Sequence, residues 1–126
     1  MMPNALDLGS FTLCLAVKDL AAASRFYEAV GFEVMPPQPT WSEHACESYG
    51  RDWLFLEHAG TKLALIQGSI ERNTLTFDAP DVRGIQRTLK GRGVRFLIET
   101  DEDGSGPGHA VCIDPDGNPI LFDQRP

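Results

Sequence analysis

The side chains best suited to chemistry in this sequence are three histidines and three cysteines, and their spacing forms no metal-binding or catalytic motif. They stand far apart, as His44, His58, His109, Cys14, Cys46 and Cys112. Zinc sites and disulfide frameworks are built from closely spaced cysteine pairs or from clusters of cysteine and histidine. The spacing therefore predicts neither a thiolate zinc site nor a set of disulfides.

Other signatures of catalysis are also missing from the sequence. There is no Gly-x-Ser-x-Gly motif, and the glycine-rich run at 104–108 leads into a predicted strand, whereas a phosphate-binding loop leads into a helix. By strand alternation, His58 and His109 fall on strand faces that pack against a helix, or at strand ends. His44 lies in an irregular segment, from which it can enter a site. The histidines therefore predict no group of converging ligands.

The overall charge argues against one class of partner. The chain carries 11 basic and 18 acidic residues, a formal net charge of −7. Nucleic-acid-binding proteins need a basic surface to offset phosphate charge, so we expect no nucleic-acid partner. No apolar run reaches the roughly 20 residues of a membrane-spanning helix, and residues 1–10 lack the basic and apolar regions of a secretory signal. We therefore expect a cytoplasmic protein with no membrane partner.

A strand and a helix are predicted at the start of the chain. In residues 10–17 large apolar side chains alternate with small or polar ones, which is typical of a half-buried strand. Asp19 is placed to accept hydrogen bonds from the first free N–H groups of a helix, and Gly31 to end that helix in a left-handed conformation. A short strand at 32–35 and a hairpin at 53–67 complete a strand–helix–strand–strand–strand order.

The same order returns in the second half of the chain. A strand at 74–78 is followed by a second helix that starts at Asp81 and ends at Gly93. A further strand and a hairpin that turns through an Asp-Pro-Asp-Gly sequence come next. The two capping aspartates are 62 residues apart, and each is followed by its glycine 12 residues later. We predict one α+β domain made of two β-α-β-β-β modules, at 10–68 and 73–124. The segments 36–52 and 100–108 are predicted to be irregular because proline or glycine interrupts them.

The sequence resembles a known superfamily at both of its ends. The segment FTLCLAVKDLAAASRFYEAVGFEV is similar to the opening of vicinal oxygen chelate proteins, which include glyoxalase I, ring-cleaving dioxygenases and bleomycin-resistance proteins. The closing segment HAVCIDPDGNPILF is similar to the ending of that superfamily. The resemblance covers nearly the whole chain and implies paired β-α-β-β-β modules whose sheet curls around a cavity, commonly in a homodimer.

The resemblance also implies where a catalytic metal would be held. In catalytic members, histidine, glutamine and glutamate ligands come from the first and last strands of each module. Carried over to this chain, the ligand positions are Thr12, Ala64, Thr74 and Leu121. Two of these side chains have no donor atom, and divalent metal sites need several imidazole, carboxylate or thiolate donors. The resemblance thus predicts a member without the metal site and without a cofactor.

Strand alternation predicts which side chains line the cavity. Small and hydroxyl-bearing residues leave room, Trp53 and Phe55 offer aromatic faces, and Glu57, Asp78 and Asp123 offer carboxylates. This combination suits a planar or cationic organic molecule. The predicted ligand-binding residues are Thr12, Cys14, Trp41, Trp53, Phe55, Glu57, Ala64, Thr74, Thr76, Cys112 and Leu121. A dimer interface is an equally good interpretation of Trp53 and Phe55, because aromatic residues are common anchors there.

The function favoured by these observations is metal-free binding of a small molecule. The chain resembles bleomycin-resistance proteins, an antibiotic-resistance type that sequesters a bulky cationic drug in a homodimer without chemistry. We therefore expect a binding protein for an aromatic or cationic organic ligand rather than an enzyme. Two alternatives stay open: a metal-dependent lyase or dioxygenase with displaced ligands, and an interaction protein whose own side chains fill the cavity.

Overall fold

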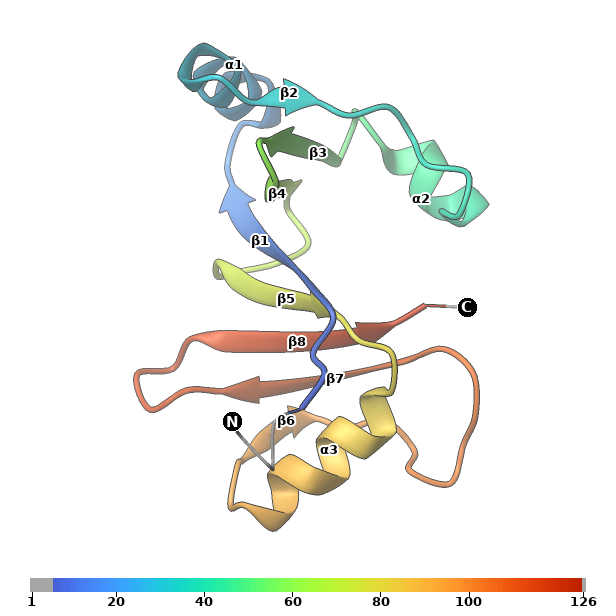
Figure 1. Cartoon of the computed structure of the whole chain (residues 1–126). Helices are drawn as coiled ribbons and strands as arrows, with labels where there is room; N and C mark the ends of the chain where they lie inside the picture. Colours follow the sequence, from blue (N-terminus) through green and yellow to red (C-terminus); the bar gives the residue numbers. More distant parts are fainter. Residues whose placement is uncertain (1–5, 126) are drawn as a thin grey trace. The chain divides into compact units, whose positions relative to one another are not determined.

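The computed structural model describes residues 6–125, which divide into two compact units (Figure 1). Residues 12–73 form the N-terminal unit, and residues 74–125 together with 6–11 form the C-terminal unit. Residues 1–5, half of the segment expected to lack a secretory signal, lie outside the described residues, as does residue 126. No helix within the described part of the chain is long and apolar enough to cross a membrane.

The N-terminal unit is a four-stranded sheet with a helix on one face. Its elements are β1 (Ser10–Val17, from residue 12 onward), α1 (Leu20–Val30), β2 (Glu33–Val34), α2 (Glu43–Ser48), β3 (Trp53–His58) and β4 (Thr61–Gln67). The strand order is β2-β3-β4-β1, with β1 parallel to β4 and the other pairs antiparallel. Leucines from α1, β3 and β4 form the core, with Leu56 and Leu65 fully buried. The predicted first strand and helix are confirmed.

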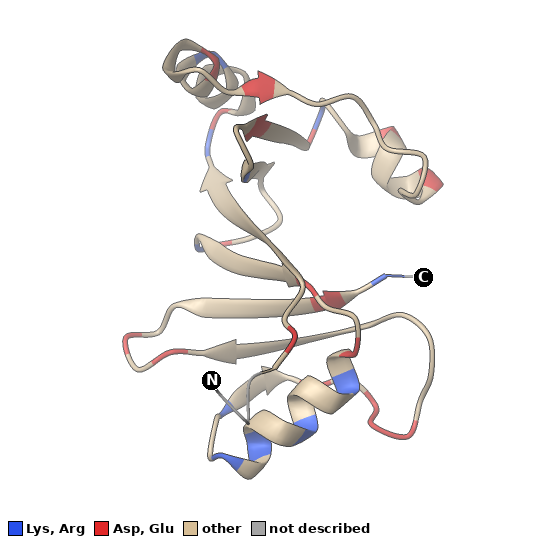
Figure 2. Cartoon of the chain, in the orientation of Figure 1, with Lys and Arg blue, Asp and Glu red and all other residues tan. Residues whose placement is uncertain are grey.

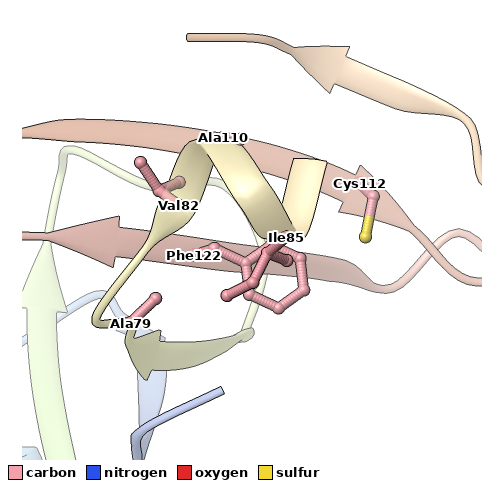
Figure 3. Close-up of a cluster of buried hydrophobic side chains, with 6 residues drawn as sticks. All are labelled: Ala79, Val82, Ile85, Ala110, Cys112 and Phe122. Carbon is pink, nitrogen blue, oxygen red and sulfur yellow. The ribbon is translucent and has the colours of Figure 1, made fainter. Parts of the chain in front are cut away.

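The C-terminal unit repeats this arrangement. Its elements are β5 (Thr74–Asp78), α3 (Val82–Gly91), β6 (Phe96–Ile98), β7 (Gly108–Ile113) and β8 (Pro119–Gln124), in the strand order β5-β8-β7-β6. Here β5 is parallel to β8, as β1 is to β4. The core lies between α3 and the sheet and contains Val82 and Ile85 from the helix with Phe122 from β8 (Figure 3). The predicted α+β class is confirmed.

Both helices begin in the same way, which explains the regular spacing of the sequence. The carboxylate of Asp19 accepts a hydrogen bond from the Ala22 amide, and that of Asp81 accepts one from the Gly84 amide, each at 3.1 Å. A glutamine at the end of the last strand of each unit completes the cap. The side chain of Gln67 accepts from the Leu20 amide at 2.8 Å, as that of Gln124 does from Val82 at 2.9 Å. Each strand end therefore fixes the start of the helix that packs on its sheet.

Two segments expected to be irregular carry more order than the sequence suggested. The segment 36–52 contains α2, which begins because the Ser42 hydroxyl accepts a hydrogen bond from the Ala45 amide at 3.1 Å, beyond the last proline of the run. The loop after β6 is bound to α3. Arg83 donates to the carbonyl oxygens of Asp101 and Gly106, both at 2.8 Å. Figure 2 shows the basic bands on α3 and the acidic stretches of the loop after β6.

Candidate functional site

The sheet face opposite α1 carries most of the residues predicted to bind a ligand. Because residues paired across neighbouring strands share a face, the register defines its rows. Cys14, Ala64 and Phe55 form one row across β1, β4 and β3, and Trp53 lies beside Ile66 in the next. Thr12 and Glu57 alternate onto the same face. Cys14 and Ala64 are buried, whereas Trp53 and Phe55 are half-buried. The N-terminal unit thus brings together six of the predicted residues, and Trp41 joins them through its ring contacts.

Four aromatic rings gather at the β3 end of this face. The ring centroid of Trp41 lies 4.7 Å from that of Trp53, 4.9 Å from that of Tyr49 and 6.4 Å from that of Phe55. The rings of Tyr49 and Trp53 are 4.8 Å apart. These distances are typical of favourable aromatic pairs. Trp41 and Tyr49 flank α2 in the sequence. The 36–52 segment therefore places these two rings against those of Trp53 and Phe55 on β3.

A pocket of about 510 Å³ lies against Trp53 in the same unit. Its apolar floor is formed by Trp53 and Ile66, and polar side chains surround that floor. The polar lining residues are His44, Ser48, Arg51, Asp52, Gln67 and Ser69. The lining is more polar than that of most small-molecule sites, so a ligand here would contact one aromatic face and several polar groups. The prediction that His44 can enter a site agrees with its position here.

The C-terminal unit has its own face opposite α3. Thr76 on β5 pairs with Leu121 on β8, and Asp78 pairs with Asp123 in the next row of that face. Thr74 alternates onto it from the start of β5. The predicted residues Thr74, Thr76 and Leu121 are therefore neighbours, and Thr76 is buried. His109 on β7 stands opposite Asp123 and extends the row of titratable side chains.

The predicted position of Cys112 is wrong. Cys112 pairs with Ile120, and Ala110 pairs with Phe122, so both lie on the α3 side of the sheet and belong to its buried core (Figure 3). Cys112 is only 3% exposed, and burial raises the pKa of its thiol. His109, expected on the helix side or at a strand end, lies near the start of β7 on the face that carries Leu121. In this core the small side chains of Ala110 and Cys112 pack with Phe122 against Val82 and Ile85 of α3.

Two carboxylates and one guanidinium meet at the edge of the C-terminal face. Arg125 Nε lies 3.2 Å from Asp78 Oδ1 and 3.8 Å from Asp123 Oδ2. Asp78 Oδ1 is buried and forms no hydrogen bond of good geometry within the described residues. Its polar contact is the ion pair with Arg125. The pKa of Asp123 is raised, mainly by burial and further by the charge of Asp78, although Arg125 and His109 oppose the rise. These groups rim a pocket of about 330 Å³.

The raised pKa of Asp123 predicts how stability changes with pH. An acid whose folded pKa lies above its unfolded value stabilises the fold below the unfolded pKa, and this contribution is lost as the pH rises through the folded pKa. Asp123→Asn removes the titration, so we expect the variant to gain free energy of unfolding relative to the original protein between about pH 4 and pH 7. Urea denaturation at both pH values measures the difference. A difference that is constant or falls with rising pH would contradict the assignment.

A comparison of the whole sequence with protein-family models identifies its family. Residues 9–122 match the model described as the Glyoxalase/Bleomycin resistance protein/Dioxygenase superfamily. The chain belongs to this superfamily. The matched range includes all the residues predicted to bind a ligand, so each of them lies within the superfamily fold. No curated protein sequence matches the chain.

Solved structures of the superfamily type share the fold at low sequence identity. A superfamily member from Vibrio splendidus has a TM-score of 0.59 and 17% identity, covering 90% of this chain and 97% of its own. A structure described as an NAD-dependent benzaldehyde dehydrogenase from Legionella pneumophila has a TM-score of 0.68 and 16% identity, covering 92% and 99%. A hypothetical protein from Bacillus halodurans has a TM-score of 0.62 and 16% identity, covering 91% and 92%. At these identities the likeness concerns the fold alone.

The residues at the superfamily's metal positions do not fit a divalent metal. Thr12 and Ala64 lie on one face of the N-terminal unit, and Thr74 and Leu121 on one face of the C-terminal unit. Their only side-chain donors are two hydroxyl groups, without imidazole, carboxylate or thiolate. Among residues 6–125, no three histidine, cysteine or acidic side chains converge to hold a metal ion.

The sequence did not reveal every residue that shapes these faces. Tyr49, Ser48 and Arg51 contribute to the aromatic cluster or the pocket, yet all three lie in the segment expected to be irregular. The Ser42-Glu43 pair was the available signal, because serine followed by glutamate is typical of a helix start. Alternation also did not show which face of β7 carries Cys112, which only the pairing of β7 with β8 locates.

Proposed function

We propose that this protein binds a small organic molecule with an aromatic or cationic group, without metal-dependent chemistry. The observation that carries the proposal is the pocket against Trp53, which lies beside a cluster of four aromatic rings in the N-terminal unit. Aromatic faces bind planar rings by stacking and cations through their π electrons. The donor-poor residues at the superfamily's metal positions support binding over catalysis.

The net charge of the protein supports a ligand that carries a cation, whereas the charges around the pocket are balanced. Asp52 lines the pocket and is half exposed, with its carboxylate 3.1 Å from Arg51 Nη2. The net charge of −7 attracts cations to the protein as a whole. Arg51 and His44 line the same pocket and oppose this preference. Varying the ring and the charge of the ligand separately would show which of the two features the pocket binds.

Calorimetric titration with four matched compounds separates the two features of the ligand. The compounds are 2-naphthylmethylammonium, naphthalene-2-methanol, cyclohexylmethylammonium and cyclohexylmethanol. We expect both naphthalene compounds to bind more tightly than their cyclohexyl counterparts, because only they stack on Trp53. Tighter binding of the ammonium member of each pair would support a cationic ligand. Absence of binding by all four would contradict the proposed function.

Replacing Trp53 tests the position of the site. We expect Trp53→Ala to weaken naphthalene binding by about 2 kcal/mol, or about thirtyfold in Kd, because it removes the aromatic floor of the pocket. Phe26→Ala is the matched control, since Phe26 is an aromatic residue on α1 that is 61% exposed and lies away from the pocket. Equal losses in the two variants would show that the binding is not at Trp53.

The alternatives are tested on the same purified protein. Tightly held zinc, nickel, manganese or iron at one ion per chain would favour a metal-dependent lyase or dioxygenase with displaced ligands. We also propose that the protein acts as a homodimer in the cytoplasm. Light scattering of the purified protein measures its mass and would contradict the dimer if it gave the mass of one chain.

A further inference from the structure

Two of the four clustered rings, those of Trp53 and Tyr49, form side-chain hydrogen bonds that do not involve Trp41, and Phe55 is bound to Tyr49 through its backbone amide. We call Tyr49, Trp53 and Phe55 the three-ring seat. The indole N–H of Trp53 donates to the Ala45 carbonyl oxygen at 3.2 Å and to the Ser48 hydroxyl at 3.1 Å. The Tyr49 hydroxyl donates to the Met35 carbonyl oxygen and accepts from the Phe55 amide at 3.2 Å. The seat is therefore anchored to β3, to α2 and to Met35 by hydrogen bonds that do not involve Trp41.

Trp41 is held in a different way. The segment from Pro36 to Trp41 contains three prolines, which have no amide hydrogen to give. Its hydrogen bonds are local: the Trp41 amide donates to the Gln38 carbonyl oxygen at 3.1 Å, and the Gln38 side chain donates to the Pro36 carbonyl oxygen at 2.8 Å. Within residues 6–125, no hydrogen bond ties residues 36–41 to a strand. Ring contacts with the three-ring seat are what hold Trp41 in place.

The position of Trp41 is the one that the ring of a ligand would take. Its indole lies within 5 Å of two rings of the seat and 6.4 Å from the third. An aromatic ligand of similar size makes the same kind of contacts. Since the segment 36–41 is anchored only locally, Trp41 can leave the seat without breaking the hydrogen bonds of β3 or α2.

We propose that the three-ring seat binds a flat aromatic ring of one or two fused cycles and that Trp41 occupies this seat until the ligand displaces it. This inference rests on the proposed function and extends the site from the pocket beside Trp53, whose lining does not include Trp41, Tyr49 or Phe55, to the space that the Trp41 ring occupies. If a ligand must displace Trp41, its apparent affinity equals its affinity for an open seat multiplied by the fraction of molecules in which the seat is open. Removing the Trp41 ring should therefore raise the affinity of the seat for the aromatic ligand.

The test compares naphthalene-2-methanol binding to the full chain and to Trp41→Ala by calorimetry. We expect the variant to bind about tenfold more tightly, which corresponds to a seat that is open in about a tenth of the original molecules. Trp41→Phe keeps a ring on the segment, so we expect its affinity to stay close to that of the original chain. Phe26→Ala again serves as the control for loss of an unrelated aromatic ring.

A second measurement keeps the inference testable if Trp41→Ala folds poorly. The chain has two tryptophans, so labelling with 5-fluorotryptophan gives two fluorine NMR signals, which Trp41→Phe assigns. On addition of naphthalene-2-methanol we expect the Trp41 signal to move to the position of a tryptophan in water.

The outcomes separate the inference from the proposed function. Weaker or unchanged binding by Trp41→Ala, or a Trp41 signal that moves away from the solvent position, would overturn the displacement while leaving the site itself in place. Failure of both the original chain and Trp41→Ala to bind would overturn the proposed function.

Discussion

Gly9→Ala is expected to destabilise the C-terminal unit by about 4 kcal/mol, among the largest effects of a single small substitution. Gly9 has a φ of +78°, a conformation that costs an L-residue about 1 kcal/mol or more. A Cβ at this position would also overlap the carbonyl oxygen and carbon of Asp78. Both partners are backbone, so no side chain can move aside to relieve the overlap. Urea denaturation measures the loss.

Gly93→Ala is the matched control for this prediction. Gly93 follows α3 in the same unit with a φ of +85°, and a Cβ there would have no heavy atom within 4 Å. Its substitution therefore tests the backbone conformation without the overlap, and we expect a loss of about 1 kcal/mol. If Gly9→Ala costs no more than Gly93→Ala, the segment before β1 does not lie against Asp78 as described.

The elements that the sequence predicts correctly are those that depend on neighbouring residues. The 10–17 strand follows from alternation, and the boundaries of α1 follow from Asp19 and Gly31, which act within one turn of the helix. The contribution of Gln67 to the same cap was not predictable in this way. Its side chain reaches Leu20 across 47 residues of sequence, and only the pairing of β4 with β1 brings them together.

The faces of β7 show where alternation alone fails. Ala110 and Cys112 are less bulky than Val111 and Ile113. Judged by apolar bulk alone, the face with Val111 and Ile113 would be expected to face the core. The structure reverses this expectation because α3 packs closely on small residues, and Ala110 is fully buried beneath it. Which face receives a helix is decided by packing between elements, and a single strand does not contain that information.

The candidate site was predictable only in part for a related reason. Alternation places Trp53 and Phe55 on the face opposite α1, as the register of β3 with β4 does, whereas the metal positions are known only from the resemblance to the superfamily. The stacking of Trp41 and Tyr49 on them requires the proline-bounded segment to fold back across the sheet, and α2 to hold it there. Such a contact depends on tertiary structure that no local pattern in 36–52 indicates.

Gln86→Leu is expected to lower the free energy of unfolding by about 3 kcal/mol. Gln86 is fully buried, and its side chain bonds both backbone groups of Thr100: it accepts from the amide at 2.8 Å and donates to the carbonyl oxygen at 3.0 Å. Leucine fills the same space and leaves both groups without partners, and each unpaired buried group costs about 1–3 kcal/mol. Urea denaturation measures the loss, and hydrogen exchange at the Thr100 amide shows whether the loop detaches.

Lys90→Met is the control for the loop's surface contacts. Lys90 reaches the same loop through an ion pair with Glu99 at 2.6 Å, but both side chains are close to half exposed. Exposed ion pairs contribute little because water screens them. We expect a loss far below that of Gln86→Leu. Similar losses in the two variants would mean that surface charge, rather than the buried amide, holds the loop on α3.

Gln86→Glu separates shape from hydrogen bonding at the same position. Glutamate keeps the oxygen that accepts from the Thr100 amide, but when ionised it cannot donate to the Thr100 carbonyl, and it faces the carboxylate of Glu102, to which Gln86 donates at 2.9 Å. Burial and this like charge raise the pKa of the new acid above its unfolded value. Its protonated form therefore favours folding, and the variant loses stability relative to the original chain as the pH rises from about 4 to 7. A deficit that does not grow with pH would show that the side chain at this position is neither buried nor close to the Glu102 carboxylate, which would contradict the described packing of the loop on α3.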